Sequence, residues 1–281
     1  MTINSCFKLK DNSRWIVNIV AKVARKIKSY CKLKYISMFE VNKVQYKIFN
    51  AKIILDLTKD VDRILYLYGF ESENLKYFKK TIKKDDVVFD VGANIGIYSL
   101  VASKTIGQNG KVYSFEPADR AHSCLLKNIE INKFKNIVPI KKGVSNYSGN
   151  ATFNVCDDDA YNSLGNEPMR KIIKTEKISV VTIDDFVKEN NIKKVDVIKV
   201  DTEGAEYLVF KGADKTLRKH KPVLLFEYNR SVVKGYSNSL GDLTDLIKSL
   251  DYALYEFING NLVMVKNNSK IMGYNLIAIA K

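Results

Sequence analysis

The chain has 281 residues, which is enough to bury one α/β core with a short extension and too few for two large domains. Hydrophobic residues make up 46% and charged residues 27% of the chain, and these values exclude a disordered or fibrous protein. The net charge of +15 predicts attraction to anionic partners. Because the basic residues are spread along the chain and form no recognisable nucleic-acid-binding module, we expect no nucleic-acid partner.

Residues 14–34 have the pattern of a basic amphipathic helix. Apolar and basic side chains alternate at helical spacing, and the two sets are Trp15, Ile16, Ile19, Val20, Val23 and Ile27, and Lys22, Arg25, Lys26 and Lys28. Asn18 and Lys22 interrupt the apolar run, which is therefore shorter than the roughly 18 residues of a membrane-spanning helix. We assign residues 1–38 to this segment, which either packs on the folded core, the interpretation we favour, or docks on an anionic membrane surface.

Neither the N-terminal segment nor the cysteines indicate secretion. The segment lacks the uninterrupted apolar core of a signal peptide. The four cysteines show no CxxC spacing, so they predict neither a zinc cage nor a disulfide framework. We expect a cytoplasmic protein, with peripheral membrane contact as the open alternative.

Residues 39–84 are predicted to form a cap that leads into the core. From Val44 to Asp56 apolar and polar residues alternate around Asn50, which predicts a β-hairpin. Residues 72–81 then have helical spacing.

Residues 85–281 are predicted to form a doubly wound α/β domain with a Rossmann-like, mostly parallel sheet. Short apolar strands alternate with helical stretches, and the strands are expected at residues 87–90, 111–116, 137–141, 195–200 and 223–227. Two late apolar runs, 253–258 and 275–280, follow one another without an intervening helix. We therefore expect an antiparallel strand at the C-terminal end of the sheet.

The first of these strands runs into a glycine-bearing turn. Gly92 and Gly96 permit a tight turn and close backbone approach, and the following helix start offers free N–H groups. Asp90 at the strand end is suited to accept hydrogen bonds from an ammonium group. A dinucleotide fingerprint requires another glycine where this chain has Asn94, so a cofactor without a pyrophosphate fits better.

Glu116 ends the next strand, about twenty residues beyond Gly96. An acidic side chain at this position can bind both hydroxyls of a ribose. Strand, turn, helix, strand and terminal acid together predict a ribose-bearing cofactor.

Three sequence motifs stand out: DVGANIG at 90–96, FEP at 115–117 and VDVIKVDTEGAEYLVFKGA at 195–213. Through these motifs the chain resembles the FkbM-type branch of the class I S-adenosylmethionine-dependent methyltransferases, over about residues 68–228. It implies S-adenosylmethionine as cofactor, bound by Asp90, Gly92, Asn94, Gly96, Glu116, Pro117, Gly143, Val144 and Asp201. Thr202 is a mild departure, because the family usually has a residue such as Val between the two acids of the last motif.

Three acids after a buried strand are the candidate catalytic residues: Asp201, Glu203 and Glu206. Ligands of open α/β sheets bind at the carboxyl ends of the strands, where these acids lie. Methyl transfer to a hydroxyl requires alignment and removal of the hydroxyl proton, which a carboxylate can accept. For Glu203 and Glu206 the alternative is capping of the following helix.

Substrate contacts are expected from two segments. The resemblance points to Asn162 and Ser163 in the polar stretch 156–164, whereas Glu227 and Asn229 follow another strand that should open onto the same crevice. No spaced ligand loop for a cation is present, so we expect no metal requirement.

We therefore predict an S-adenosylmethionine-dependent O-methyltransferase acting on a sugar hydroxyl of a polysaccharide, glycolipid or glycosylated metabolite, with the acceptor class implied by the resemblance alone. Two alternatives stay open. The basic charge also suits a methyltransferase acting on nucleic acid or another small metabolite, although no Asn-Pro-Pro-aromatic motif follows Val200. A cofactor-binding, membrane-associated adaptor without catalysis is the other, and the presence of Asp90, Glu116 and Asp201 argues against it.

Overall fold

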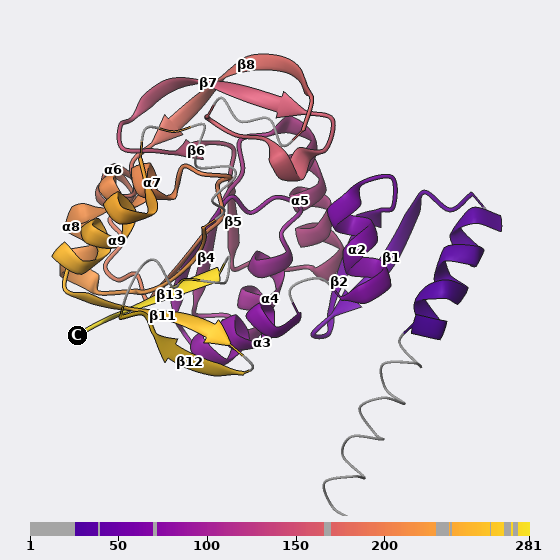
Figure 1. Ribbon diagram of the computed structural model, residues 1–281, viewed down its shortest axis with the longest axis horizontal. Helices are drawn as coiled ribbons and strands as arrows, with labels where there is room; N and C mark the ends of the chain where they lie inside the picture. Colours follow the sequence, from indigo (N-terminus) through magenta and orange to yellow (C-terminus); the bar gives the residue numbers. More distant parts are fainter. Residues whose placement is uncertain are drawn as a thin grey trace, which may run out of the picture. The chain divides into compact units, whose positions relative to one another are not determined.

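The computed structural model describes residues 26–38, 40–69, 72–165, 170–228, 236, 238–258, 260–266, 271 and 275–281. They form two compact units, shown in Figure 1. The smaller unit contains the described residues up to 44 together with 55–69, and the larger one contains 45–54 and the described residues from 72 onward.

The smaller unit is built from two helices. Residues 26–38 are helical, whereas residues 14–25 of the predicted amphipathic helix lie outside the described residues. The helix packs on α2 (Asp60–Tyr68), where Ser29 Oγ donates to the Leu67 carbonyl at 2.9 Å. The ammonium of Lys32 lies 4.2 Å from the centre of the Tyr66 ring. Across the described part of the chain, no helix has the length and apolar character needed to cross a bilayer.

The predicted hairpin is confirmed. Strands β1 (Lys43–Ile48) and β2 (Ala51–Asp56) pair as a two-stranded sheet. Phe49 and Asn50 connect them with φ of 43° and 68°, the left-handed pair that a two-residue hairpin turn requires. The predicted helix over 72–81 is also present, as α3 (Ser72–Thr81).

The larger unit has the predicted doubly wound sheet. Its eight strands lie in the order β12-β11-β13-β10-β9-β3-β4-β5. The bounds are β3 (Val87–Val91), β4 (Lys111–Phe115), β5 (Ile137–Ile140), β9 (Val197–Val200), β10 (Val223–Glu227), β11 (Tyr252–Ile258), β12 (Asn261–Met264) and β13 (Asn275–Ala280). The five strands from β10 to β5 are parallel, and β13 pairs antiparallel with both β10 and β11. The expected antiparallel C-terminal strand is therefore confirmed.

Helices cover both faces of this sheet (Figure 1). One face carries α4 (Ile97–Ile106) and α5 (Asp119–Asn132); the other carries α6 (Ile183–Glu189), α7 (Glu206–Lys211), α8 (Asp214–His220) and α9 (Leu240–Ser249). On the second face the rings of Phe89, Phe115 and Phe186 meet with centroids 4.8 to 5.8 Å apart. All three are nearly buried, so they form part of the core that holds α6 on the sheet.

A second sheet, which the sequence pattern did not predict, follows β5. Strands β6 (Gly143–Val144), β7 (Gly149–Cys156) and β8 (Ile172–Val181) lie in the order β6-β8-β7, with the short helix η1 (Asp159–Tyr161) between β7 and β8. Arg120 at the start of α5 pairs with Asp159 of η1. Because α5 starts just after the carboxyl end of β4, this pair places η1 near the edge of the main sheet where ligands of such folds bind.

Two asparagines on successive turns of α5 hold strand β2 of the hairpin. Asn128 is fully buried; its Oδ1 accepts from the Ile54 N–H at 2.8 Å and its Nδ2 donates to the Ile95 carbonyl at 2.9 Å. Asn132, one turn further, exchanges two hydrogen bonds with the backbone of Lys52. Backbone N–H and C=O groups on the free edge of β2 therefore form hydrogen bonds with side chains of α5 instead of with another strand.

We predict that Asn128→Ala lowers the free energy of unfolding by about 2 to 6 kcal/mol, because it leaves the Ile54 N–H and the Ile95 carbonyl without a partner and each such group costs about 1 to 3 kcal/mol. Asn132→Ala is the matched control, and its loss should be smaller because water can reach the Lys52 backbone. Urea unfolding measures both. Equal losses would contradict the role assigned to Asn128.

Candidate active site

The turn after β3 approaches the end of β9 as closely as backbone allows. Gly92 has φ +75°, and a Cβ there would lie 1.8 Å from the Asp201 carbonyl oxygen. The N–H groups of Gly92 and Ala93 both donate to the Phe115 carbonyl, at 3.0 and 2.9 Å. Glycine is therefore required at this position, and the turn joins the carboxyl ends of β3, β4 and β9.

Asp90 is the buried carboxyl at the base of this turn, 1% exposed. Its Oδ2 accepts from Ser99 Oγ at 2.5 Å, whereas its Oδ1 is buried and has no hydrogen-bond partner among the described residues. Burial raises the pKa of Asp90, and the nearby Lys199 ammonium opposes this rise. A buried oxygen without a donor is costly, so Asp90 is suited to a ligand that brings an N–H donor or a positive charge.

Glu116 connects the turn to the start of α5. Its Oε2 accepts from the Asn94 N–H at 2.8 Å and its Oε1 from the Ala118 N–H at 2.9 Å. Burial raises the pKa of Glu116 to about 7. These two hydrogen bonds hold the side chain in place. Each carboxylate oxygen can accept another hydrogen bond, so Glu116 can also bind ligand hydroxyls.

The remaining residues predicted for the cofactor gather beside Glu116. A Cβ on Gly143 would lie 3.1 Å from the side chains of Ile178 and Val180 and 4.0 Å from Pro117. Val144 is 3% exposed and pairs with β8. Gly96 has φ +94° and packs against Leu125. The structure thus brings all the predicted cofactor residues to one edge of the sheet, while their contact with a cofactor stays a prediction.

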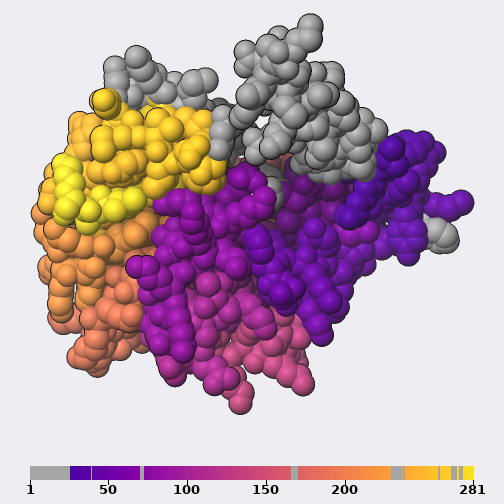
Figure 2. Space-filling view, turned by 90° about the horizontal axis from the view of Figure 1, so that it is seen from below, coloured from indigo at the N-terminus to yellow at the C-terminus, as the bar shows by residue number. Residues whose placement is uncertain are grey.

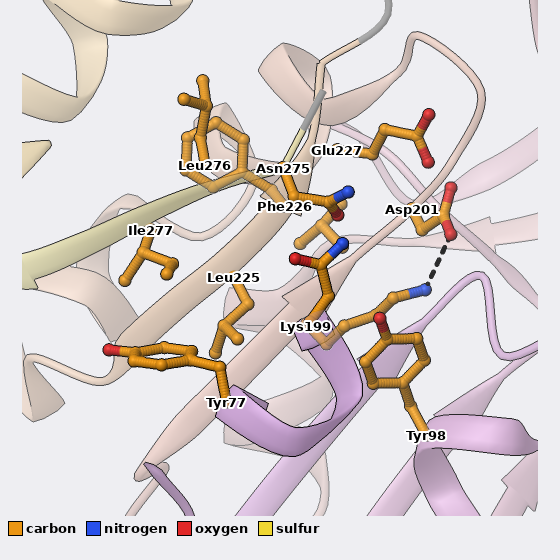
Figure 3. A pocket seen from close by; sticks show the side chains of 12 residues that line it. Tyr77, Tyr98, Lys199, Asp201, Leu225, Phe226, Glu227, Asn275, Leu276 and Ile277 are labelled. Carbon is orange, nitrogen blue, oxygen red and sulfur yellow. Dashed lines mark hydrogen bonds and ion pairs between the residues drawn. The ribbon is translucent and has the colours of Figure 1, made fainter. Parts of the chain in front are cut away.

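Asp201 forms an ion pair with a buried lysine. Its N–H donates to the Val91 carbonyl at 3.0 Å, which continues the sheet hydrogen bonding past β9. Its Oδ2 lies 3.0 Å from Nζ of Lys199, whose side chain is only 8% exposed (Figure 3). The same ammonium lies 4.7 Å from the centre of the Tyr98 ring. Lys199 therefore fixes one oxygen of Asp201.

Glu206 organises the turn that carries the other acids. Its Oε1 accepts from the N–H and the hydroxyl of Thr202, both at 2.9 Å, and from the Gly204 N–H at 3.3 Å. Glu203 stands in this turn with φ +53°. Burial and the charges of Asp201 and Glu206 raise the pKa of Glu203 to about 9. Glu206 therefore holds the turn in front of α7, and no side-chain capping hydrogen bond is present at the start of that helix. The raised pKa of Glu203 favours its protonated form.

A cleft opens beside Asp201 (Figure 3). Its polar lining is Asn74, Tyr77, Tyr98, Lys199, Asp201, Glu227 and Asn275. Asn74 and Tyr77 come from α3, and Figure 2 shows the purple segment that contains α3 alongside the yellow C-terminal strands. The Tyr77 and Phe257 rings are in contact there, with centroids 4.8 Å apart.

The predicted substrate residues are divided between this cleft and the second sheet. Glu227 lines the cleft, and Asn229 lies outside the described residues. Asn162 accepts the Cys156 N–H at 2.7 Å, and its buried Nδ2 has no hydrogen-bond partner among the described residues. Ser163 is 2% exposed and its hydroxyl donates to the Gly165 carbonyl at 3.3 Å, so it supports the fold of this loop.

Sequence reasoning missed several residues that the structure brings to the site. Lys199 had a usable signal, because a lysine inside a buried apolar strand requires a charged partner. Tyr236 had no such signal: its ring packs on Gly165, and burial, together with the charges of Glu206 and Glu203, raises the pKa of its phenol. Asn74 and Asn275 depend on how distant elements pack. No group of three His, Cys, Asp or Glu side chains arranged to hold a metal ion occurs in the described ranges.

Residues 90–254 match the sequence family described as the methyltransferase FkbM domain. The chain belongs to this family. The resemblance inferred from the three motifs is confirmed, and with it the assignment of the protein as a methyltransferase with a class I fold.

Individual relatives are distant. The hexuronic acid methyltransferase AglP of Haloferax volcanii is 26% identical over 72% of this chain and 80% of its own length. Methyltransferase 1 of Beauveria bassiana is 27% identical over 46% of this chain, which spans 59% of that protein. The structure of FkbM from Methylobacillus flagellatus is 19% identical with a TM-score of 0.48, over 76% of this chain and 52% of that one.

We predict that the free energy of unfolding falls as the pH rises from about 4.5 toward about 9, because Glu203 binds a proton in the folded state that the unfolded state releases near its usual pKa. The contribution is at most about 1.4 kcal/mol per pH unit. Glu203→Gln should flatten this dependence, whereas Glu130→Gln on the exposed surface of α5 should not. Parallel curves for wild type and Glu203→Gln in urea titrations at several pH values would show that Glu203 is ionised in the folded protein.

Proposed function

We propose that the protein uses S-adenosylmethionine to methylate a hydroxyl of a sugar, carried by a polysaccharide, a glycolipid or a glycosylated metabolite. The observation that carries the proposal is the pair of buried carboxyls at neighbouring strand ends. Asp90 has an oxygen without a donor, and Glu116 is held by two N–H groups with acceptor capacity left over.

The donor set fits this cofactor. Asp90 is suited to its ammonium group and Glu116 to its two ribose hydroxyls. Pro117 and Gly143 lie next to each other beside Glu116, and we place the adenine ring there. Because Asn94 stands where a dinucleotide fingerprint has a glycine, a bound pyrophosphate is disfavoured.

The cleft beside Asp201 has the chemistry of a sugar site. Tyr77 and Tyr98 offer apolar ring surface, and Asn74, Glu227 and Asn275 offer side-chain donors and acceptors for hydroxyls. The Haloferax relative is named as a hexuronic acid methyltransferase, which supports a sugar acceptor for this chain as well.

The cofactor supplies a methyl group on a sulfonium, ready for in-line displacement. The protein has to hold the acceptor hydroxyl in line and take its proton. Asp201 is the residue we assign to this proton, because the 3.0 Å ion pair with Lys199 holds Oδ2 and leaves Oδ1 to accept. Glu206, which binds three donors of the 202–204 turn, keeps Asp201 in place, and protonated Glu203 can donate a hydrogen bond to the substrate.

We expect Glu116→Ala to weaken binding of S-adenosylhomocysteine by roughly 1.5 to 3 kcal/mol, about 10- to 150-fold in Kd, through loss of charge-assisted hydrogen bonds to the ribose. Wild-type affinity should also rise as the pH is raised through about 7, where Glu116 ionises, and the variant should lose this rise. Calorimetry at several pH values tests both. Glu130→Ala is the control, and unchanged affinity in Glu116→Ala would refute the ribose role.

We expect Asp201→Asn to retain cofactor binding and lower turnover by about 10²- to 10⁴-fold, the usual contribution of a positioned general base. The acceptor is found first, by measuring S-adenosylhomocysteine release with panels of hexuronic acids, neutral sugars and nucleosides. Asp214→Asn on the surface of α8 is the matched control. Full activity of Asp201→Asn would remove this residue from the mechanism, and release with nucleosides alone would exclude the sugar acceptor.

A further inference from the structure

The helix of residues 26–38, in indigo in Figure 1, has one face occupied within its own unit. Ser29 is buried and bonded to the Leu67 carbonyl, and Lys32 donates to the Tyr66 carbonyl. Ile36 is half-buried on the same face, since residues three, four and seven positions apart align along a helix. The partner of this face is therefore α2.

The opposite face is exposed and carries three large apolar side chains around one lysine, whose ammonium lies 5.9 Å from the centre of the Tyr30 ring. Ile27, Tyr30 and Met38 are 59%, 61% and 78% exposed, and Lys34 lies between Tyr30 and Met38 at helical spacing. Large apolar side chains aligned on one exposed helical face mark an interaction surface more often than isolated exposed residues do.

The charge of this helix identifies the kind of partner. Residues 26–38 contain four lysines and no acidic residue, and the longer sequence 14–34 contains seven basic residues and no acidic one. Lys26 and Lys28 stand on either side of the Ile27 stripe, about 100° from it around the helix axis. Long basic side chains that flank an apolar stripe are the arrangement that lies in the interface of an acidic bilayer, with the ammonium groups at the headgroups.

Other occupants fit less well. Two copies of this chain meeting through this face would bring their lysines together without a counter-charge. A nucleic acid would pair with the lysines and leave the apolar stripe unused. The described part of the helix, residues 26–38, spans about 20 Å, and no helix among the described residues is long and apolar enough to cross a bilayer. We therefore place this face in the membrane plane.

We infer that the exposed face of residues 26–38, carrying Ile27, Tyr30, Lys34 and Met38, is a docking surface for membranes rich in acidic lipid. Binding is driven by burial of the apolar side chains and by attraction between the lysines and the acidic headgroups. Added salt therefore weakens it. The inference is independent of the cofactor and of the acceptor.

Vesicle co-sedimentation of the full chain tests the inference. Wild type should bind phosphatidylcholine vesicles that contain phosphatidylserine and should not bind pure phosphatidylcholine, and added salt should weaken binding. The variant Ile27→Ser/Tyr30→Ser/Met38→Ser should bind at least about tenfold more weakly. The control Ile173→Ser/Tyr147→Ser/Leu126→Ser removes exposed apolar residues elsewhere and should bind like wild type.

A second pair of variants tests whether the position of the lysines matters, because both variants change the net charge of the protein by the same amount. Lys26→Glu/Lys28→Glu/Lys34→Glu should lose binding, whereas Lys104→Glu/Lys127→Glu/Lys219→Glu, all exposed elsewhere, should retain most of it. Thermal melting and S-adenosylhomocysteine binding confirm that each variant is folded. The inference is overturned if wild type binds neither vesicle, if both charge variants lose binding equally, or if the apolar variant binds like wild type. It is also overturned if light scattering shows a wild-type dimer that the apolar variant abolishes.

Discussion

The absence of a side chain at Gly92 is the constraint on which the site depends. A Cβ there would overlap the carbonyl oxygen of Asp201, so only glycine lets the turn after β3 lie against the end of β9. This contact brings Asp90 and Asp201, which are more than a hundred positions apart in the chain, to the same small region. The Lys199 ammonium then interacts with both carboxyl groups.

The electrostatic character of the site follows from this convergence. Asp90, Glu116, Asp201, Glu203 and Glu206 meet at one edge of the sheet, with Lys199 as the cation paired to Asp201. The pKa values of four of these acids are raised, chiefly by burial. Such an excess of carboxyl groups favours a ligand that brings positive charge, and a sulfonium with an ammonium group brings two. Glu116 and Glu206 also hold backbone N–H groups, so their burial serves the fold as well as the ligand.

Much of the fold was predictable from the sequence because its elements carry local signals. Buried parallel strands read as short apolar runs, and the Gly92 turn with Glu116 at the next strand end indicated a cofactor edge. The second sheet was missed because β8 is largely exposed and shows no apolar alternation over most of its length. The placement of Ser163 against Asn154 and of Tyr236 against Gly165 depends on long-range packing, which no local pattern encodes.

The function, like the fold, was predictable from the sequence only in part. The methyltransferase assignment rests on residues close in sequence or at predictable strand ends, and family membership confirms it. The acceptor site that we propose lies in a cleft lined by residues of α3, α4, β9, β10 and β13, whose polar side chains come together only in the folded protein.

The most direct test of the account is a calorimetric titration of the purified protein with S-adenosylhomocysteine, and with NAD for comparison. Both ligands carry an adenosine ribose. S-adenosylhomocysteine also has an ammonium group for Asp90, whereas NAD has a pyrophosphate instead. We expect saturable binding of S-adenosylhomocysteine at one site and no measurable binding of NAD. Tighter binding of NAD than of S-adenosylhomocysteine, or binding of neither ligand, would contradict the cofactor assignment. It would also contradict the roles given to Asp90 and Glu116, on which the proposed function rests.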